Sequence, residues 1–238
     1  MSVLLPIKGE KEPFTLNPSK IIALGLNYRD HVKESVFLNS RNLPPDPPSE
    51  PILFAKTPNV LIGNGKTIVI PGFIRRDYNF TDIRIDYEAE LAVVIGKHCS
   101  RVKRDEALTY VLGYTCMNDV SMRNFQTTDK SGWFRGKSLD TFGPVGPVII
   151  PSNVIPDPQN LQIKCRLNGE TVQDSHTSNM IFSVEETIEF ISRQISLERG
   201  DIIMTGTPSG VGRLKHGDIV EVEIEKIGTL TNNVIEEP

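Results

Sequence analysis

Short apolar runs separated by turn-forming residues dominate the sequence from Ile52 onward, and they constrain the fold more than any other feature. The runs are ILFAK, TIVIPGF, EAELAVVIG, PVGPVII, LQIKCRL, GDIIMTG and GDIVEVEIE. Runs of this length that are rich in Val and Ile and bounded by Gly, Pro, Asn or Asp are typical of β-strands. Residues 20–26, KIIALGL, predict one further buried strand. The sequence therefore predicts a β-rich α+β protein with few helices.

Local signals predict where several of these elements begin and end. Asn168 and Gly169 stand between two alternating segments, and Asn-Gly is the strongest short signal for a β-hairpin. A short helix is expected over residues 27–35, with Asn27 as its N-cap. The segment NLPPDPPSEP, residues 42–51, is expected to be a loop because its five prolines fix the backbone and remove hydrogen-bond donors.

Two further helices are expected to interrupt the strands. One covers KRDEALTYVL, residues 103–112. The other covers SVEETIEFISRQI, residues 183–195, where Ser183 and Glu186 have the spacing of a capping box. Its apolar residues recur at helical spacing and predict one buried stripe, made of Val184, Ile188, Ile191 and Ile195.

Charge and composition exclude several classes of partner. The 238-residue chain has 26 Lys and Arg against 30 Asp and Glu, so its net charge of -4 gives no basic surface for nucleic acid or an anionic membrane. No apolar run approaches the roughly 20 residues of a membrane span. We therefore expect a small-molecule partner.

The three cysteines, Cys99, Cys116 and Cys165, are odd in number and widely spaced. This pattern predicts free thiols in a reducing compartment rather than a disulfide framework. The N-terminal segment also has no positive region before its short apolar stretch, which Pro6 interrupts, and is a poor secretory signal. We expect a cytoplasmic protein.

Carboxylates at every second position mark the segment RIDYEAELAVVIG, residues 84–96. Residues two apart in a strand face the same side, so Glu88 and Glu90 share a face with Ala92 and Val94. A half-solvated strand is the alternative, and the segment VEVEIEK shows that pattern, because no apolar residue joins its glutamates on their face. Charged groups are buried only when they are paired or bind a metal.

A hard metal ion is one partner that fits adjacent carboxylates. Oxygen ligands without a His or Cys cluster suit Mg²⁺, Mn²⁺ or Ca²⁺ better than zinc. A third oxygen ligand is needed, and Asp119 in CMNDVS follows an apolar run at the end of a predicted strand. The sequence alone does not bring Asp119 to Glu88, and an ordinary acidic residue at a strand end is the alternative.

Several of these stretches together resemble the fumarylacetoacetate hydrolase family. The resemblance extends from about Lys20 to about Asn233 and is carried, in order, by GLNYRDHVKE, PILFAKTPNVLIG, DYEAELAVVIGK, GYTCMNDVSMRNFQ, WFRGKSLDTFGPVGP, LNGETVQDSHTSNMIFS and GDIIMTGTPSGVG. It implies a mixed β-roll or β-sandwich, which we divide into residues 1–50, with a strand, lid helix and Pro-rich loop belonging to the same unit, and a catalytic metal-binding domain at 51–238. It also implies a homodimer.

The resemblance assigns roles to residues at matching positions. It implies that Glu88, Glu90 and Asp119 bind one divalent cation, usually Mg²⁺ or Mn²⁺, with Ca²⁺ as a substitute. It also implies that His31 and Glu34, three apart on a short mobile helix, activate water. An i, i+3 carboxylate can orient the imidazole, whose usual pKa suits a general base. An exposed surface helix is the alternative.

Four more positions match substrate or transition-state contacts of the family. They are Arg123, Gln126, Lys137 and Thr207. Solvated loop residues are the alternative. Thr207 lies in TGTPSGVG, which lacks the Gly-Lys-Ser/Thr ending of a phosphate loop.

The resemblance implies 2-oxo acids or 1,3-diketo acids as substrates. A metal-stabilised enolate would permit C–C cleavage at C3, as in acylpyruvate or fumarylpyruvate hydrolysis or oxaloacetate-type decarboxylation, which is the leading prediction. An isomerase of the 5-carboxymethyl-2-hydroxymuconate type, or a related hydratase, is the close alternative. A non-catalytic protein that binds oxo acids is a more distant one. The loops at 36–50 and 127–136 are expected to shape the distal pocket.

Overall fold

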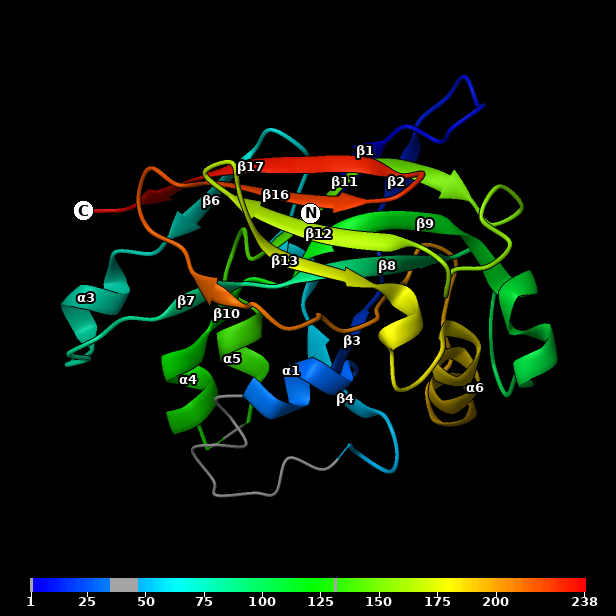
Figure 1. The fold of residues 1–238 in the computed structure, drawn as a ribbon, viewed down its shortest axis with the longest axis horizontal. Coiled ribbons are helices and arrows are strands. Elements are labelled where there is room, and N and C mark those ends of the chain that lie inside the picture. Colours follow the sequence, from blue (N-terminus) through cyan, green and yellow to red (C-terminus); the bar gives the residue numbers. More distant parts are fainter. Residues whose placement is uncertain (1, 35–46, 131) are drawn as a thin grey trace.

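A computed structural model describes residues 2–34, 47–130 and 132–238 (Figure 1). The expected helix end at Ser35, the beginning of the Pro-rich segment at 42–46 and most of the expected pocket loop at 36–50 lie outside the described residues.

A seven-stranded mixed sheet forms the centre of the fold. Its order is β4 (Ile52–Lys56), β3 (Ile21–Gly25), β14 (Ile202–Met204), β8 (Ala89–Ile95), β9 (Val111–Asn118), β11 (Gly143–Pro151) and β5 (Leu61–Ile62). The pairs β14–β3 and β11–β5 are parallel, whereas the other neighbours are antiparallel. The N-terminal strand β3 is thus enclosed by strands from the rest of the chain.

A five-stranded sheet packs over this one. Its order is β13 (Glu170–His176), β12 (Gln162–Leu167), β16 (Ile219–Ile224), β17 (Gly228–Glu236) and β6 (Thr67–Ile70). Figure 1 shows β12, β16 and β17 lying along β8 and β9. Side chains of both sheets share one apolar core, which includes Leu91, Val93, Cys116, Val222 and Leu230.

Two small sheets contain the remaining strands of the described residues. One joins β10 (Ser121–Met122), β7 (Ile85–Tyr87) and β15 (Gly212–Arg213), and the other pairs β1 (Val3–Leu5) with β2 (Phe14–Leu16). The curled, β-rich arrangement with few helices confirms the predicted mixed β-roll. The division into units at residue 50 stays a prediction.

The helices are short and mostly lie at the margins of the sheets. They are α1 (Arg29–Glu34), α3 (Phe73–Asp77), α4 (Arg123–Thr128), α5 (Phe134–Lys137) and α6 (Val184–Gln194), with 3-10 turns η1 (Pro58–Val60), η2 (Arg104–Tyr110) and η3 (Thr177–Asn179). Figure 1 shows α1, α4 and α5 gathered along one edge of the molecule. The candidate site lies among the elements that meet there.

The predicted hairpin is confirmed. Strands β12 and β13 pair from Leu167 and Glu170 outward, with Asn168 and Gly169 as the two turn residues. Both have positive φ values, 53° and 85°, as the turn preferred by twisted hairpins requires.

Helix α6 is confirmed with its capping box. The Ser183 side chain accepts a hydrogen bond from the Glu186 N–H, and the Glu186 side chain accepts one from the Ser183 N–H. Val184, Ile188 and Ile191 are buried, but Ile195 is 40% exposed because the helix ends before it. The predicted stripe was therefore one residue too long.

Two other helix predictions need correction. Residues 104–110 form a 3-10 helix instead of an α-helix. Asn27 does not cap α1, because its side chain bonds to the backbone of Phe182 and Thr205 and so ties this segment to two others.

The structure agrees with the expectations for the cysteines and for the half-solvated segment VEVEIEK. Cys99, Cys116 and Cys165 are all free and buried. In β16, Val220, Val222 and Ile224 are buried, while Glu221 and Glu223 on the other face are partly exposed. Across the described ranges, no helix combines the length and apolarity that crossing a membrane requires.

The capping box yields a prediction about stability. Replacing Ser183 with Ala removes the bond to the Glu186 N–H and leaves that donor without its cap. We expect the free energy of unfolding, measured with urea, to fall by about 1 kcal/mol. Ser196→Ala, at an exposed serine that follows the same helix, should change it by less than about 0.5 kcal/mol. Equal effects of the two substitutions would contradict the assigned role of the cap.

Candidate metal and catalytic site

Glu88 occupies the junction where the chain passes from one sheet to another. It lies between β7 of the three-stranded sheet and β8 of the central sheet. Its N–H donates to the Asn118 side chain (2.9 Å), and its carbonyl accepts from the Asp119 N–H (2.9 Å). These two bonds place Glu88 beside the end of β9.

Three buried carboxylates converge at this junction. Glu88, Glu90 and Asp119 are 4%, 1% and 0% exposed, and one oxygen from each lies within 4.8 Å of the others. Among the described residues, this is the group of His, Cys, Asp and Glu side chains with the spacing to hold a metal ion. The structure therefore brings together the two glutamates and the distant aspartate named from the sequence.

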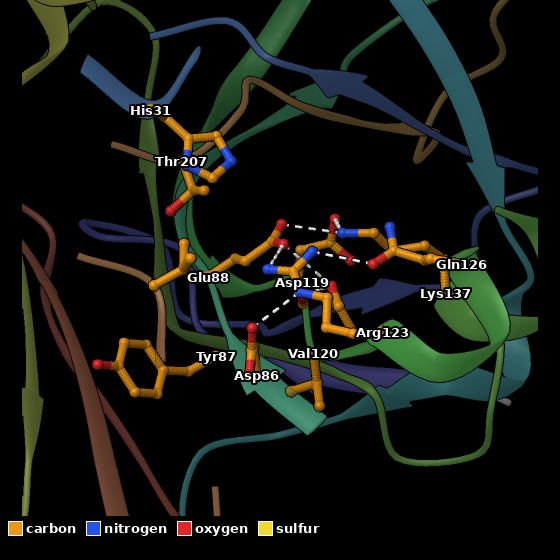
Figure 2. Close-up of polar contacts among 12 residues, drawn as sticks. His31, Asp86, Tyr87, Glu88, Asp119, Val120, Arg123, Gln126, Lys137 and Thr207 are labelled. Atoms are coloured by element: carbon orange, nitrogen blue, oxygen red, sulfur yellow. Dashed lines mark hydrogen bonds and ion pairs between the residues drawn. The ribbon is translucent and has the colours of Figure 1, made fainter. Parts of the chain in front are cut away.

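Three cationic side chains surround the carboxylates. Lys137 of α5 donates to Glu88 Oε2 (2.9 Å) and Asp119 Oδ2 (2.6 Å). Arg123 of α4 lies 2.6 Å from Glu88 Oε1, and Lys56 of β4 lies 2.6 Å from Asp119 Oδ1. Figure 2 shows the Glu88 carboxylate directed toward Lys137 and Arg123, with His31 and Thr207 on another side of it.

Asp86 is the third carboxylate of the alternating segment, and it belongs to a different cluster. It is fully buried and pairs with the guanidinium groups of Arg84 (3.0 Å) and Arg123 (2.8 Å). Because Arg123 also contacts Glu88, Asp86 fixes the orientation of a cation at the site without joining the three converging carboxylates.

The two glutamates have opposite pKa shifts. Burial raises the pKa of Glu88, but the charges of Lys137 and Arg123 outweigh burial, so its pKa lies well below the usual range. Burial together with the nearby charges of Asp119 and Glu88 raises the pKa of Glu90 well above the usual range. Glu90 also accepts a hydrogen bond from the Gly206 N–H (2.8 Å).

His31 and Glu34 form a hydrogen-bonded pair on α1. His31 Nδ1 lies 3.2 Å from Glu34 Oε1, and His31 is 8% exposed. The Glu34 oxygen also accepts a bond from the Gly210 N–H (2.8 Å). Burial raises the pKa of Glu34, but the hydrogen bonds from His31 and Gly210 lower it by more than burial raises it. The net shift is downward and favours the ionised carboxylate. Glu34 therefore orients the His31 ring.

One cavity is lined both by His31 of this pair and by the carboxylates of Glu88 and Glu90. Most of the site residues named from the sequence line it, namely His31, Glu88, Glu90, Arg123, Gln126, Lys137 and Thr207. Glu34 and Asp119 do not line it, but each bonds to a residue that does, Glu34 to His31 and Asp119 to Lys137. The Gln126 carbonyl oxygen accepts a bond from Arg123 (2.9 Å), whereas the Thr207 hydroxyl donates to the Ala89 carbonyl (2.8 Å) and accepts from Gln173 (2.9 Å). A substrate role for Thr207 stays a prediction.

Sequence reasoning missed several residues at this site. Lys56 ends the otherwise apolar strand run ILFAK. A charged residue at the end of such a run was the signal that the sequence offered. Phe54 of the same strand and Trp133 both line the cavity, with ring centroids 5.2 Å apart in an edge-to-face arrangement. They give the cavity an apolar wall, and the Lys137 ammonium lies 4.9 Å from the centroid of the Phe54 ring.

The donor set fits a hard divalent cation. It consists of carboxylate oxygens, the ligands that Mg²⁺, Mn²⁺ and Ca²⁺ prefer. Burial first, and then the charges of Asp119 and Glu88, raise the pKa of Glu90, so the surrounding cations do not fully offset these effects. A divalent ion between the three carboxylates would supply the missing positive charge.

Comparisons with family models and with known sequences give matches over most of the chain. The family model described as fumarylacetoacetate (FAA) hydrolase C-terminal matches residues 20–235. The mitochondrial oxaloacetate tautomerase Fahd2a of Rattus norvegicus is 40% identical over 225 residues, which cover 92% of this chain and 67% of the relative.

Two solved structures have similar folds. The 5-carboxymethyl-2-hydroxymuconate delta-isomerase of Mycobacterium smegmatis has a TM-score of 0.80 at 36% identity, covering 94% of this chain and 81% of that one. The fumarylpyruvate hydrolase of Pseudomonas aeruginosa, in complex with Mn²⁺ and pyruvate, has a TM-score of 0.83 at 28% identity, covering 99% and 97%.

The pKa of Glu90 predicts a proton linkage. Below its raised pKa this carboxyl holds a proton, and a cation that binds the ionised carboxylate must displace it. We expect Mn²⁺ affinity to weaken as the pH falls and Mn²⁺ binding to release a proton. Isothermal titration calorimetry in buffers of different ionisation enthalpy measures this release. Glu90→Gln should bind more weakly and release no proton from this position, and a binding heat that does not depend on the buffer would contradict the linkage.

Proposed function

The chain belongs to the fumarylacetoacetate hydrolase family, whose members include hydrolases, isomerases and tautomerases, and we propose that it is a metal-dependent enzyme acting at C3 of a small 2-oxo acid. The observation that carries the proposal is the placement of one oriented base, His31, on the same cavity as the buried carboxylates and their cations. Each part of that arrangement has a chemical role.

The cationic residues of the cavity select an anionic substrate. Arg123 and Lys137 both line the cavity, and the Gln126 amide lies beside Arg123. Carboxylate and oxo oxygens accept hydrogen bonds from such donors. We propose that these residues bind the acid end of the substrate, with Lys137 next to the oxygen on which negative charge develops.

His31 is the proposed general base. Its Nδ1 is engaged by Glu34, so Nε2 is the ring nitrogen left to exchange a proton with substrate. Removal of a proton from C3 moves negative charge onto the 2-oxo oxygen and gives an enolate. A divalent cation held by Glu88, Glu90 and Asp119 would supply Lewis-acid stabilisation of that charge.

Proton transfer is the reaction we place first. Keto–enol exchange or double-bond migration needs the base to take a proton at one position and a proton to return at another, and the site offers that base. The rat relative named as an oxaloacetate tautomerase and the mycobacterial structure named as an isomerase are 40% and 36% identical to this chain. We therefore propose an oxaloacetate-type tautomerase or a hydroxymuconate-type isomerase.

C–C cleavage is the second candidate. The relative named as a fumarylpyruvate hydrolase matches the fold over nearly the whole chain. A His31 ring held by an ionised carboxylate can also activate water for attack on a distal carbonyl. Decarboxylation of oxaloacetate would also leave an enolate, that of pyruvate, because carbon dioxide instead of a proton departs from C3.

A substrate panel separates these reactions. Oxaloacetate, acetylpyruvate, fumarylpyruvate and a hydroxymuconate are incubated with the full chain and Mg²⁺ or Mn²⁺, and products are identified by NMR together with enol absorbance. We expect faster ketonisation of enol-oxaloacetate or isomerisation of the muconate, with activity lost on chelation. His31→Ala should lower kcat by about 100-fold or more.

His98 provides a matched control. It forms an exposed pair with Glu198 (2.9 Å) outside the cavity, so His98→Ala should leave turnover unchanged. Pyruvate with a released acid or with carbon dioxide as the main product would favour the second candidate. Full turnover by His31→Ala, or by protein stripped of metal, would overturn the proposal.

A further inference from the structure

Lys56 is a fully buried lysine that neither the carboxylate pattern nor the catalytic pair accounts for. Its side chain is 0% exposed, and its ammonium group lies 2.6 Å from Asp119 Oδ1 and 3.3 Å from the Val120 carbonyl. The ammonium does not line the cavity. It approaches Asp119 from the side of β4, within the protein.

The two oxygens of Asp119 therefore have separate surroundings. Oδ1 is engaged by Lys56, while Oδ2 bonds to Lys137, which also bonds to Glu88 and lines the cavity. The Asp119 N–H, bonded to the Glu88 carbonyl at 2.9 Å, fixes the backbone from which this carboxylate projects. Oδ2 is thus the Asp119 oxygen that shares a cationic partner, Lys137, with Glu88.

We propose that Lys56 determines metal specificity by limiting Asp119 to a single coordinating oxygen. The inference rests on the metal site of the proposed function, and it adds a residue that would select among cations at that site. Ca²⁺ accepts six to eight oxygens and commonly takes both oxygens of one carboxylate, whereas Mg²⁺ requires near-octahedral geometry with fewer, closer ligands. By occupying Oδ1, Lys56 disfavours the larger ion.

A purely structural ion pair makes a different prediction. If Lys56 serves only to neutralise Asp119, its removal changes the affinity for all divalent cations by a similar factor. If it restricts the ligand mode, removal frees Oδ1 and favours Ca²⁺ more than Mg²⁺ or Mn²⁺. The ratio of affinities therefore separates the two roles, whereas a single affinity does not.

The test measures metal binding without turnover. Free Mn²⁺ is followed by electron paramagnetic resonance in the full chain and in Lys56→Met, and Mg²⁺ and Ca²⁺ are measured by competition. We expect the Ca²⁺ to Mg²⁺ affinity ratio to rise by about tenfold in Lys56→Met. The electron paramagnetic resonance spectrum of bound Mn²⁺ should also change, because its ligand set changes.

Lys20 provides a matched control. It forms a 2.6 Å ion pair with the buried Asp201, away from the three carboxylates, so Lys20→Met should leave the ratio unchanged. Lys56→Arg keeps a cation at Oδ1 and should keep the ratio near that of the native chain. It also provides a folded comparison, and Lys56→Gln replaces Lys56→Met if that variant fails to fold.

Three outcomes would overturn the inference. They are an unchanged ratio in a folded Lys56→Met or Lys56→Gln, an equal change in Lys20→Met, and a native chain that binds no divalent cation. Only the last outcome also removes the proposed function. A ratio that depends on Lys56 in a protein without turnover on 2-oxo acids would support the metal inference while the proposed reaction fails.

Discussion

Burial of Glu88, Glu90 and Asp119 within reach of one another is the constraint on which the rest of the site depends. An uncompensated buried charge is strongly unfavourable, so positive groups must accompany the carboxylates into the protein. They come from three separate segments, as Lys56 of β4, Arg123 of α4 and Lys137 of α5. The electrostatic requirement thus holds α4 and α5 against the central sheet, to which β4 already belongs.

These cations compensate the negative charges of the two glutamates unequally. Glu88 has two cationic partners, Lys137 and Arg123. Lys137 and Arg123 favour the ionised form of Glu88, while Glu90 receives a single backbone hydrogen bond and feels the repulsion of its two neighbours. The low pKa of Glu88 therefore favours its ionised form, whereas burial and the neighbouring carboxylates raise the pKa of Glu90 and favour its protonated form. Asp86 and Arg84 contribute indirectly, because they restrain Arg123.

Much of this arrangement follows from local sequence signals. The Asn168-Gly169 hairpin and the capping box at Ser183 are determined by a few adjacent residues, and both were predictable. The face shared by Glu88 and Glu90 follows from the two-residue period of a strand. Asp119 was a candidate from its place at a strand end, but only the family resemblance joined it to Glu88 and Glu90, because the spacing of residues along the chain does not encode which strands become neighbours.

The features that sequence reasoning missed depend on tertiary contacts. Lys56 belongs to the site only because β4 ends beside Asp119, which is 63 residues away in the chain. Asn27 has the residue type of a helix cap, yet its side chain satisfies the backbone of Phe182 and Thr205 instead. Asp86 shares the alternation of the two glutamates, but the neighbouring guanidinium groups of Arg84 and Arg123 place it in another cluster.

The turn TGTPSGVG connects the two halves of the site. The Gly206 N–H donates to Glu90 and the Gly210 N–H donates to Glu34, so one loop contacts both the carboxylate cluster and the helix that carries His31. Both glycines have positive φ values, 90° and 94°, and an added Cβ would lie 2.7 Å from the Asn27 Cβ or 2.1 Å from the Val172 carbonyl oxygen. Only glycine meets both conditions without strain. The glycines of this loop therefore place backbone donors against carboxylates, and through them they fix the position of the base relative to the proposed metal ligands.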